Sequence, residues 1–402
     1  MTCPPVPENV LGVLVPSGSD SELTSSSRDY SPTSGSRSLQ SIPILPATKG
    51  FLALPPELIY QVLSHFKEIR TEHILGCTNY INDSIPEDLS ARFKALRALS
   101  QLSRLSRSIF LPLLWKRFQI CLACDSDWRW EWQNSIGKAM ERKCKGLLES
   151  EHIWSYVKIV TVPICWPRFT RNFEALSTFA QLLEVLPNVH TLEVLRTGSL
   201  LPQSLETVFK GKTFPSIQKV VLPTRAHEIL RCCSKVRDVT CNEGDGGQLV
   251  SALVHTGRSN VEILRGVTVR PTFMKRLGKV KPPLKCIRIN DRNKNLTEEV
   301  FSTLPAFRSL RTIEIECFEG KNIDSAVKSA SEILRKCAEH TQVTKSWNLR
   351  KTTKNARSIN PRSINPEPRS VRVLRYRSGM SVCDRTPLDF IPVRIEVFTA
   401  EV

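Results

Sequence analysis

The sequence predicts a mixed α/β protein, α+β overall, in which a small helical domain precedes a repetitive α/β solenoid. Three observations lead to this prediction. Apolar residues recur at helical spacing in two stretches of residues 51–118. Short apolar triplets, typical of short strands, then recur seven times within residues 151–341. Polar or basic segments, predicted to be disordered, flank the two domains at 1–50 and 342–402.

Composition limits the class of protein. The chain has 402 residues, of which 41% are apolar and 24% are charged, so most of it is expected to pack. An odd count of 13 cysteines argues against a secreted disulfide scaffold and favours reduced, buried thiols. The apolar stretch at 10–15 follows Glu8 and no basic residue, so no signal peptide is expected. No run approaches the roughly 18 apolar residues of a membrane helix. A cytoplasmic or nuclear protein without membrane contact is therefore expected.

The net charge of +18 is distributed unevenly along the chain. Residues 1–50 carry −1, 51–118 carry +3, 119–341 carry +9 and 342–402 carry +7. The segment Arg265–Lys294 alone holds ten basic residues against one acidic residue, which accounts for the whole excess of its block. The positive charge is thus expected on one short part of the repeats and on the basic tail.

The helical domain is predicted to begin near Leu54. Proline in the first turn of a helix loses no needed hydrogen bond, and Glu57 suits the positive end of the helix dipole. The apolar face of this helix is formed by Leu58, Ile59, Val62, Leu63 and Phe66. After a polar insertion at about 67–90, a second helix is predicted, which Pro112 is expected to end. Its apolar positions are Leu96, Leu99, Leu102, Leu105 and Ile109.

Two segments of this domain resemble an F-box-like domain of the fungal type over residues 51–118. They are Leu-Pro-x-Glu-Leu-Ile-x-x-Val-Leu from Leu54 and a second segment that ends in Leu-Pro-Leu-Leu-Trp at Trp115. Where the family usually has a Cys and a Trp, this chain has Ser103 and Ser106. The resemblance implies an apolar surface that docks a Skp-type adaptor. Its residues here are Leu54, Pro55, Leu58, Ile59, Val62, Leu63, Leu113, Leu114 and Trp115. An ordinary helical hairpin that caps the next domain is the alternative.

Residues 119–150 are predicted to be a linker or capping segment. Trp128, Trp130 and Trp132 alternate with charged residues there, which indicates either a strand or a loop that fills a core.

Each repeat contains the pattern apolar-x-x-apolar-x-apolar, whose last two apolar residues indicate a short strand with buried side chains. The triplets are Val157/Val160/Val162, Val189/Leu192/Val194, Ile217/Val220/Leu222, Val236/Val239/Cys241, Val261/Leu264/Gly266, Leu284/Ile287/Ile289 and Leu310/Ile313/Ile315. One connecting helix is predicted between Phe173 and Leu186, where Pro187 follows.

This periodicity resembles irregular leucine-rich repeats over residues 151–341; a mixed α/β domain with ordinary alternation is the alternative. In a curved repeat array, the residue between the last two apolar positions lies on the concave surface. These residues are Thr161, Glu193, Val221, Thr240, Arg265, Arg288 and Glu314. We hypothesise that Arg265 and Arg288, with Lys285, form a basic patch for an acidic or phosphorylated target. A solvated face without function is the alternative.

The remaining tail, 342–402, is basic and predicted to be mostly disordered, with a short strand near 393–398.

The sequence shows no motif typical of an enzyme, and we expect no catalysis, cofactor or metal. His-Glu-x-x-His, Gly-x-Ser-x-Gly and Gly-x-Gly-x-x-Gly are absent. Cys121 and Cys124 could supply two zinc ligands, with Cys144 and His152 as conceivable partners. A structural zinc site normally has a second close pair, so free thiols are favoured.

The two resemblances together imply the substrate-recognition subunit of a Skp/cullin/F-box ubiquitin ligase, which delivers a target protein for degradation. A leucine-rich-repeat interaction scaffold with no ligase link is the first alternative. A nucleic-acid-binding protein that uses Arg265–Lys294 and the tail is the second, and it is disfavoured because interleaved aromatic residues are scarce. The sequence does not identify the target.

Overall fold

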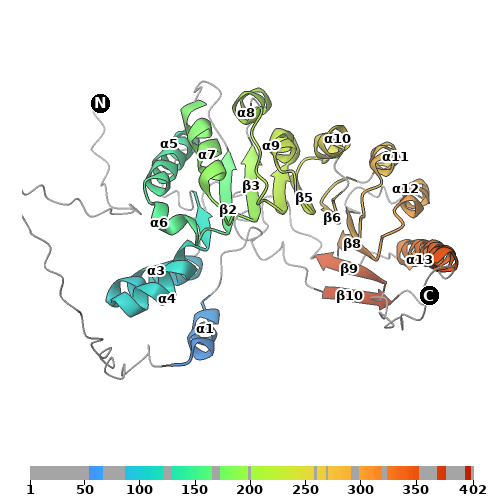
Figure 1. Ribbon diagram of the computed structural model, residues 1–402, viewed down its shortest axis with the longest axis horizontal. Coiled ribbons are helices and arrows are strands. Elements are labelled where there is room, and N and C mark those ends of the chain that lie inside the picture. Colours follow the sequence, from blue (N-terminus) through green and yellow to red (C-terminus); the bar gives the residue numbers. More distant parts are fainter. Residues whose placement is uncertain are drawn as a thin grey trace, which may run out of the picture. The chain divides into compact units, whose positions relative to one another are not determined.

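The computed structural model describes residues 54–66, 87–120, 129–164, 173–197, 201–257, 260–268, 270–290, 298–318, 324–352, 369–376 and 394–399. The predicted mixed α/β class is confirmed, because helices alternate with the strands of one ten-stranded sheet (Figure 1). The predicted arm at 1–50 and the insertion up to residue 86 lie outside the described residues.

The helical unit forms around one small core. Its helices are α1 (Pro56–Ser64), α3 (Glu87–Leu102) and α4 (Arg104–Trp115). Pro56 and Glu57 occupy the first turn of α1, as predicted. Ile59 and Leu63 point from α1 into a core that also contains Leu96 and Phe110. This core is separate from that of the sheet.

The second predicted helix is in fact two helices, because the chain breaks at Ser103. The backbone of Ser103 is extended, and its side chain accepts a hydrogen bond from the backbone N–H of Ser106 at 3.1 Å. Serine favours such N-cap positions because its hydroxyl satisfies an N–H that has no partner within the helix. The expectation that Pro112 ends the helix is also wrong, since Pro112 lies inside α4.

The sheet contains ten strands in chain order, of which the first nine run parallel and the last is antiparallel to its neighbour. The strands are β1 (Arg117–Gln119), β2 (Ile159–Ile164), β3 (Thr191–Thr197), β4 (Lys219–Pro223), β5 (Asp238–Glu243), β6 (Ile263–Arg265), β7 (Cys286–Asn290), β8 (Thr312–Phe318), β9 (Ser370–Tyr376) and β10 (Arg394–Thr399).

The seven predicted strands are confirmed as β2 to β8, with the register that the aligned triplets predict. Their middle residues lie side by side in the sheet: Val160, Leu192, Val220, Val239, Leu264, Ile287 and Ile313. Two further strands follow the same pattern. Trp115, Phe118 and Ile120 form a repeat at β1, and Val371 and Val373 form one at β9, where Val371 pairs with Ile313.

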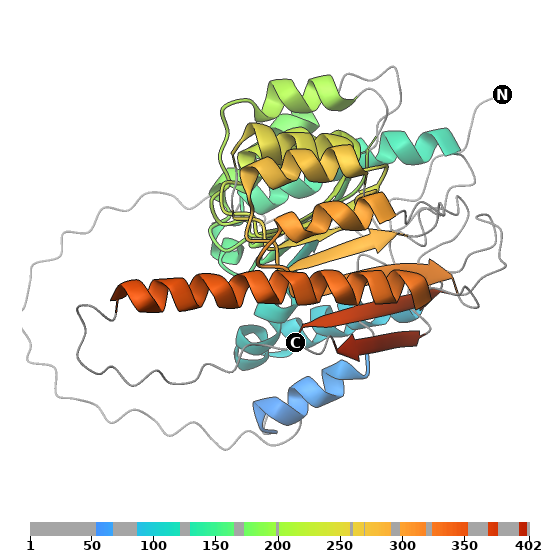
Figure 2. The same cartoon turned by 90° about the vertical axis from the view of Figure 1, so that its right-hand side faces the viewer.

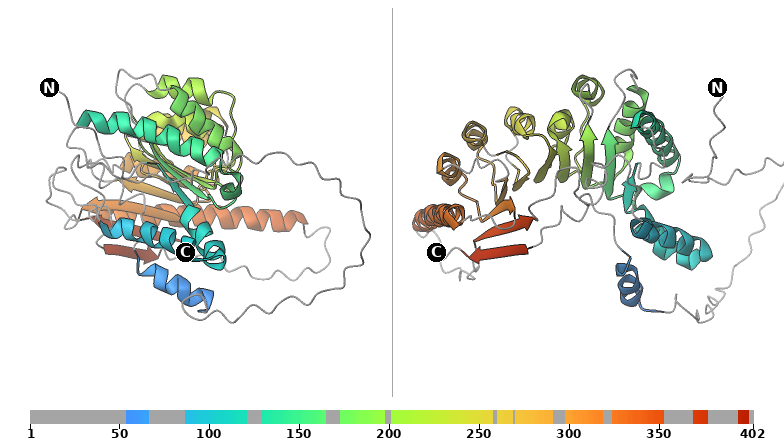
Figure 3. Two further views of the ribbon diagram at one scale, coloured as in Figure 1. Left: turned by 90° about the vertical axis from the view of Figure 1, so that its left-hand side faces the viewer. Right: turned by 180° about the vertical axis from the view of Figure 1, so that it is seen from behind.

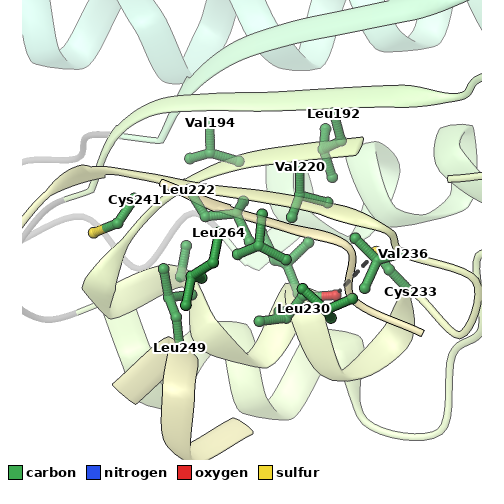
Figure 4. Close-up of a cluster of buried hydrophobic side chains, with 14 of the residues drawn as sticks. Leu192, Val194, Val220, Leu222, Leu230, Cys233, Val236, Cys241, Leu249 and Leu264 are labelled. Atoms are coloured by element: carbon green, nitrogen blue, oxygen red, sulfur yellow. Dashed lines mark hydrogen bonds between the residues drawn. The ribbon is translucent and has the colours of Figure 1, made fainter. Parts of the chain in front are cut away.

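Helices between the strands line one face of the sheet (Figures 1 and 3). They are α5 (Arg129–Leu148), α6 (Glu151–Trp154), α7 (Phe173–Val185), α8 (Leu201–Phe209), α9 (His227–Cys232), α10 (Gly247–His255), α11 (Pro271–Val280), α12 (Glu298–Thr303) and α13 (Asp324–Thr352). The predicted helix after Phe173 is thus confirmed as α7. The continuous core lies between these helices and the sheet. Figure 4 shows part of it, where Leu230 of α9 and Leu249 of α10 meet the strand residues Val220 and Leu264.

Two segments differ from the predicted domain organisation. The tryptophan-rich stretch was expected as a strand or loop, but residues from Arg129 onward form α5. The tail 342–402 was expected to be mostly disordered, yet α13 continues to Thr352, and β9 and β10 extend the sheet (Figure 2). The short strand predicted near 393–398 is confirmed as β10. Alternation in β9 is hard to recognise because Arg372 and Arg375 lie among its apolar residues and Arg369 directly precedes it.

Gly266 explains the one repeat that lacks an apolar third residue. Its φ is +68°, and a Cβ atom at this position would lie 1.9 Å from the carbonyl oxygen of Cys241 in the preceding repeat. Only glycine tolerates both this backbone conformation and so close an approach. The strand β6 therefore ends at Arg265.

Candidate functional site

The first candidate surface is an apolar stripe on α1, formed by Leu54, Leu58 and Val62. The three side chains are 37%, 44% and 41% exposed. Leu58 and Val62 are four residues apart, so they lie on one side of the helix, and Leu54 continues the row before its first turn. Pro55 is exposed next to them. We call these three residues the α1 stripe.

The other residues predicted to contact the adaptor have structural roles. Ile59 and Leu63 are the buried anchors of α1, with 2% and 1% exposure. Leu113 and Leu114 are half-buried against the same core. Trp115 instead packs against the core of the sheet domain, because it is the first residue of the β1 repeat. Of the nine predicted residues, four are thus exposed at α1, and the other five are buried or half-buried.

Sequence reasoning missed three exposed apolar side chains on the other two helices, Phe93, Leu102 and Leu105. Leu102 is the last residue of α3 and Leu105 lies in the first turn of α4. Leu102 and Leu105 are among the apolar positions predicted for one continuous helix, whereas Phe93 is not part of that prediction. The signal that identifies them is Ser103, whose preference for N-cap positions indicates a break in the helix.

The second candidate surface is the pair Arg265 and Arg288, which the structure brings together on adjacent strands, as predicted. Both guanidinium groups converge on Glu314 of β8. Arg265 Nε donates to Glu314 Oε2 at 3.2 Å and Arg288 Nε to the same oxygen at 2.8 Å. Arg265 also pairs with Asp238 at 3.2 Å, and Arg288 with Glu316 at 3.2 Å.

Arg372 of β9 approaches Glu314 at 3.9 Å and completes a group of three guanidiniums and three carboxylates, which we call the Glu314 network. The predicted third member of the patch, Lys285, lies outside it and pairs with Glu262 at 2.9 Å. Each cation of the predicted basic patch therefore has a carboxylate partner within its own domain.

Electrostatics inside the network follow from burial and charge. Burial raises the pKa of the Glu314 carboxyl, but Arg288 and Arg265, through charge and hydrogen bonds, outweigh it and hold that pKa below its ordinary value. The neighbouring Cys286 thiol has its pKa raised to about 11, first by burial and then by Glu314. Glu314 is therefore ionised and Cys286 protonated at neutral pH.

Five of the ten basic residues of the Arg265–Lys294 segment lie on or directly beside α11 rather than on the sheet. Lys275, Arg276 and Lys279 are exposed on this helix, opposite its buried residues, and Lys281 is exposed directly after it. Arg270, which precedes the helix, stacks over the ring of Phe273 at 5.5 Å.

A second buried polar group links the first three strands. Arg117 Nη1 of β1 donates to Glu193 Oε2 of β3 at 2.6 Å and to Thr161 Oγ1 of β2 at 3.1 Å. Thr161 in turn donates to Glu193 at 2.7 Å. Two of the residues predicted to face a ligand, Thr161 and Glu193, are thus mutually satisfied and buried.

The described residues contain no group of His, Cys, Asp and Glu side chains that would hold a metal ion. Cys121 and Cys124 lie outside them. Cys144 is buried in the core, and burial raises the pKa of its thiol to about 12, whereas His152 is exposed. Cys144 is therefore a core residue.

No described helix is both long enough and apolar enough to cross a membrane. No protein-family model matches the chain, and no curated protein matches it either.

Proposed function

We propose that this protein is the substrate-recognition subunit of a Skp/cullin/F-box ubiquitin ligase. Its α1 stripe, together with α3 and α4, would dock the adaptor, and its repeat domain would hold the target protein. Another subunit would perform the chemistry. An assembly of this kind works in the cytoplasm or nucleus.

The observation that carries the proposal is the division of α1 into two apolar faces. Ile59 and Leu63 already anchor the helix to its own core, so the α1 stripe is not needed for folding. Three exposed large apolar side chains, two on one short helix and one just before it, are typical of a surface that a partner buries. Tyr60, 54% exposed, lies on another side of the same helix, because residues two apart do not share a helix face.

The repeat domain supports the second half of the proposal. A parallel strand and a helix recur in each unit, in the manner of irregular leucine-rich repeats, and each unit buries its apolar face only against its neighbours. Such arrays offer a long surface for another protein. The pairing of Arg265 and Arg288 with Glu314 weakens the nucleic-acid alternative, because the guanidiniums are already neutralised.

Co-purification with a Skp-type adaptor tests the proposal. A Leu58→Asp, Val62→Asp double variant is expected to lose adaptor binding, because two charges would have to be desolvated in an apolar interface. Both positions are exposed, so the variant is expected to fold. The matched control is Gln61→Asp, an exposed polar position on the same helix, which is expected to retain binding.

Failure of the wild-type chain to bind the adaptor would contradict the proposal, as would equal binding by the double variant. Either result would favour the repeat-protein scaffold without a ligase link, since the repeat domain exists independently of the adaptor surface.

A further inference from the structure

In seven of the repeats, the residue directly before the strand is held by a recurring pair of hydrogen bonds. Its carbonyl oxygen accepts from two successive N–H groups of the next repeat. The Lys116 carbonyl, for example, accepts from Lys158 and Ile159 at 3.0 Å each. The residues whose carbonyls accept such pairs are Lys116, Lys158, His190, Gln218, Arg237, Glu262 and Lys285.

This bonding sets these residues in a row just before the strands, at the strand spacing of about 4.8 Å. Four of the seven are Lys or Arg, and only Glu262 is acidic. In the second half of the row, Glu262 lies between Lys285 at 2.9 Å and Arg237 at 3.9 Å, so one of the two positive charges there is compensated and both cations have a carboxylate partner.

The first half of the row is different. Lys116 and Lys158 of the row are exposed there, and so is Lys219, the first residue of β4, which directly follows the row residue Gln218. None of these three lysines has a carboxylate within ion-pair distance among the described residues. Together with the exposed His190 we call them the basic rim. The pKa of the His190 imidazole is lowered, first by burial and then by Lys158, Lys116 and Lys219, which places all three cations near one ring.

The basic rim contrasts with three arginines that lie within the strands. Arg117, Arg265 and Arg288 all have carboxylate partners in this domain. Like charges held on neighbouring strands repel each other, and an anionic partner would relieve that repulsion.

The spacing of the rim indicates the shape of this partner. From β1 to β4 the row covers three strand intervals, or about 14 Å. In an extended peptide, side chains on one side recur about every 6.7 Å, so acidic residues at i, i+2 and i+4 span about 13 Å. Stacking of nucleic-acid bases needs exposed aromatic rings, and the nearby Trp154 and Tyr156 pack against the core instead.

We propose that the basic rim binds an extended acidic peptide segment of a target protein, with carboxylates at alternate positions. This proposal names the chemical class of the target, an acidic segment. It rests on the proposed receptor function only in calling the bound protein a target, because peptide binding is measured without the adaptor.

The test uses the full chain and a fluorescent peptide in which Glu alternates with Ser. Fluorescence anisotropy is the readout, at about 0.1 M salt, where the Debye length is about 10 Å. The wild type is expected to bind this peptide and to bind its Gln-for-Glu counterpart much more weakly. Lys158→Glu with Lys219→Glu is expected to weaken binding about tenfold or more, since two attractions become repulsions.

The matched control is Lys275→Glu with Lys279→Glu on α11, which changes the net charge equally. It is expected to alter affinity by less than about twofold, because charges more than a Debye length away are screened. A milder pair, Lys158→Gln with Lys219→Gln, should give an intermediate loss.

Three results would overturn the proposal: no binding by the wild type, equal loss in the rim and α11 variants, or tighter binding of a single-stranded oligonucleotide of equal charge. The last result would assign the rim to phosphate polyanions. Adaptor co-purification by the rim variant separates the two proposals, because the rim variant leaves the α1 stripe intact.

Discussion

Glu314 shows how a buried charge becomes tolerable in this protein. The carboxylate loses hydration on burial, which disfavours its ionised form, and Arg265 and Arg288 restore that loss by donating to it from two neighbouring strands. A carboxyl whose pKa is lower in the folded state stabilises the fold above the unfolded pKa. That contribution is lost as the pH falls through the folded pKa.

We therefore predict that Glu314→Gln lowers the free energy of unfolding by roughly 1–3 kcal/mol near pH 7, because two guanidiniums lose their shared partner. The difference between wild type and variant should shrink as the pH falls below the ordinary carboxyl value of 4.5. Urea unfolding across this pH range measures it. Glu332→Gln, in an exposed pair with Arg335 on α13, is the control and should have a smaller effect. A difference for Glu314→Gln that does not change with pH would contradict the explanation.

For single residues, the sequence predicted the place of a side chain in the sheet better than its ion-pair partners. Aligned triplets placed Arg265, Arg288 and Glu314 in one column on successive strands, and the structure has them there. The pairing of both arginines with Glu314 was missed although all three lie in this column. The outer ion pairs could not be found from it, because Asp238 and Glu316 lie two positions away and Arg372 belongs to a strand that was not predicted.

Among the elements, α3 and α4 show that two serines can define a helix break. Ser103 caps α4, and the buried Ser106 hydroxyl donates to the carbonyl oxygen of Leu99 in α3. These are the two positions at which the sequence departs from the F-box pattern. Both serines form hydrogen bonds with nearby backbone groups of α3 and α4. Their presence in place of Cys and Trp therefore does not require a change in the α1 stripe.

We predict that Ser106→Ala lowers the stability of the helical unit by about 1 kcal/mol, because the Leu99 carbonyl loses a donor in a buried place. The loss of far-ultraviolet circular dichroism in urea measures it. Ser108→Ala is the matched control, since this exposed serine bonds only within its own helix, and alanine is the better helix former. Equal effects of the two substitutions would contradict the assigned role of Ser106.

Short repeats were predictable because a parallel sheet repeats the same burial pattern at each strand. The triplet pattern was overlooked at the two ends of the sheet, β1 and β9, where a domain boundary or a disordered tail was predicted. Trp115, Phe118 and Ile120 make a full triplet, but Trp115 was assigned to the adaptor surface, and the predicted boundary after residue 118 divided the group. At the other end, Val371 and Val373 stand between arginines in a segment judged by its charge.

The whole sheet domain is held together by neighbour contacts, since each strand pairs only with the strands before and after it. Stability in such an array is approximately the sum of terms for single repeats and for their interfaces. Damage at one end should therefore remain near that end. The hairpin of β9 and β10 covers the edge of β8, which would otherwise present unpaired backbone groups.

This reasoning predicts a graded response to Val371→Asp. Val371 is fully buried beside Ile313, so the charge should cost about 3 kcal/mol or more and detach β9 and β10. Hydrogen exchange should accelerate in β8 and β9 but stay slow in β3, six repeats away. Val397→Asp, on the exposed side of β10, should leave β8 protected. Equal acceleration in β3 and β8 would show instead that the array unfolds as one unit, which would contradict independent neighbour contacts.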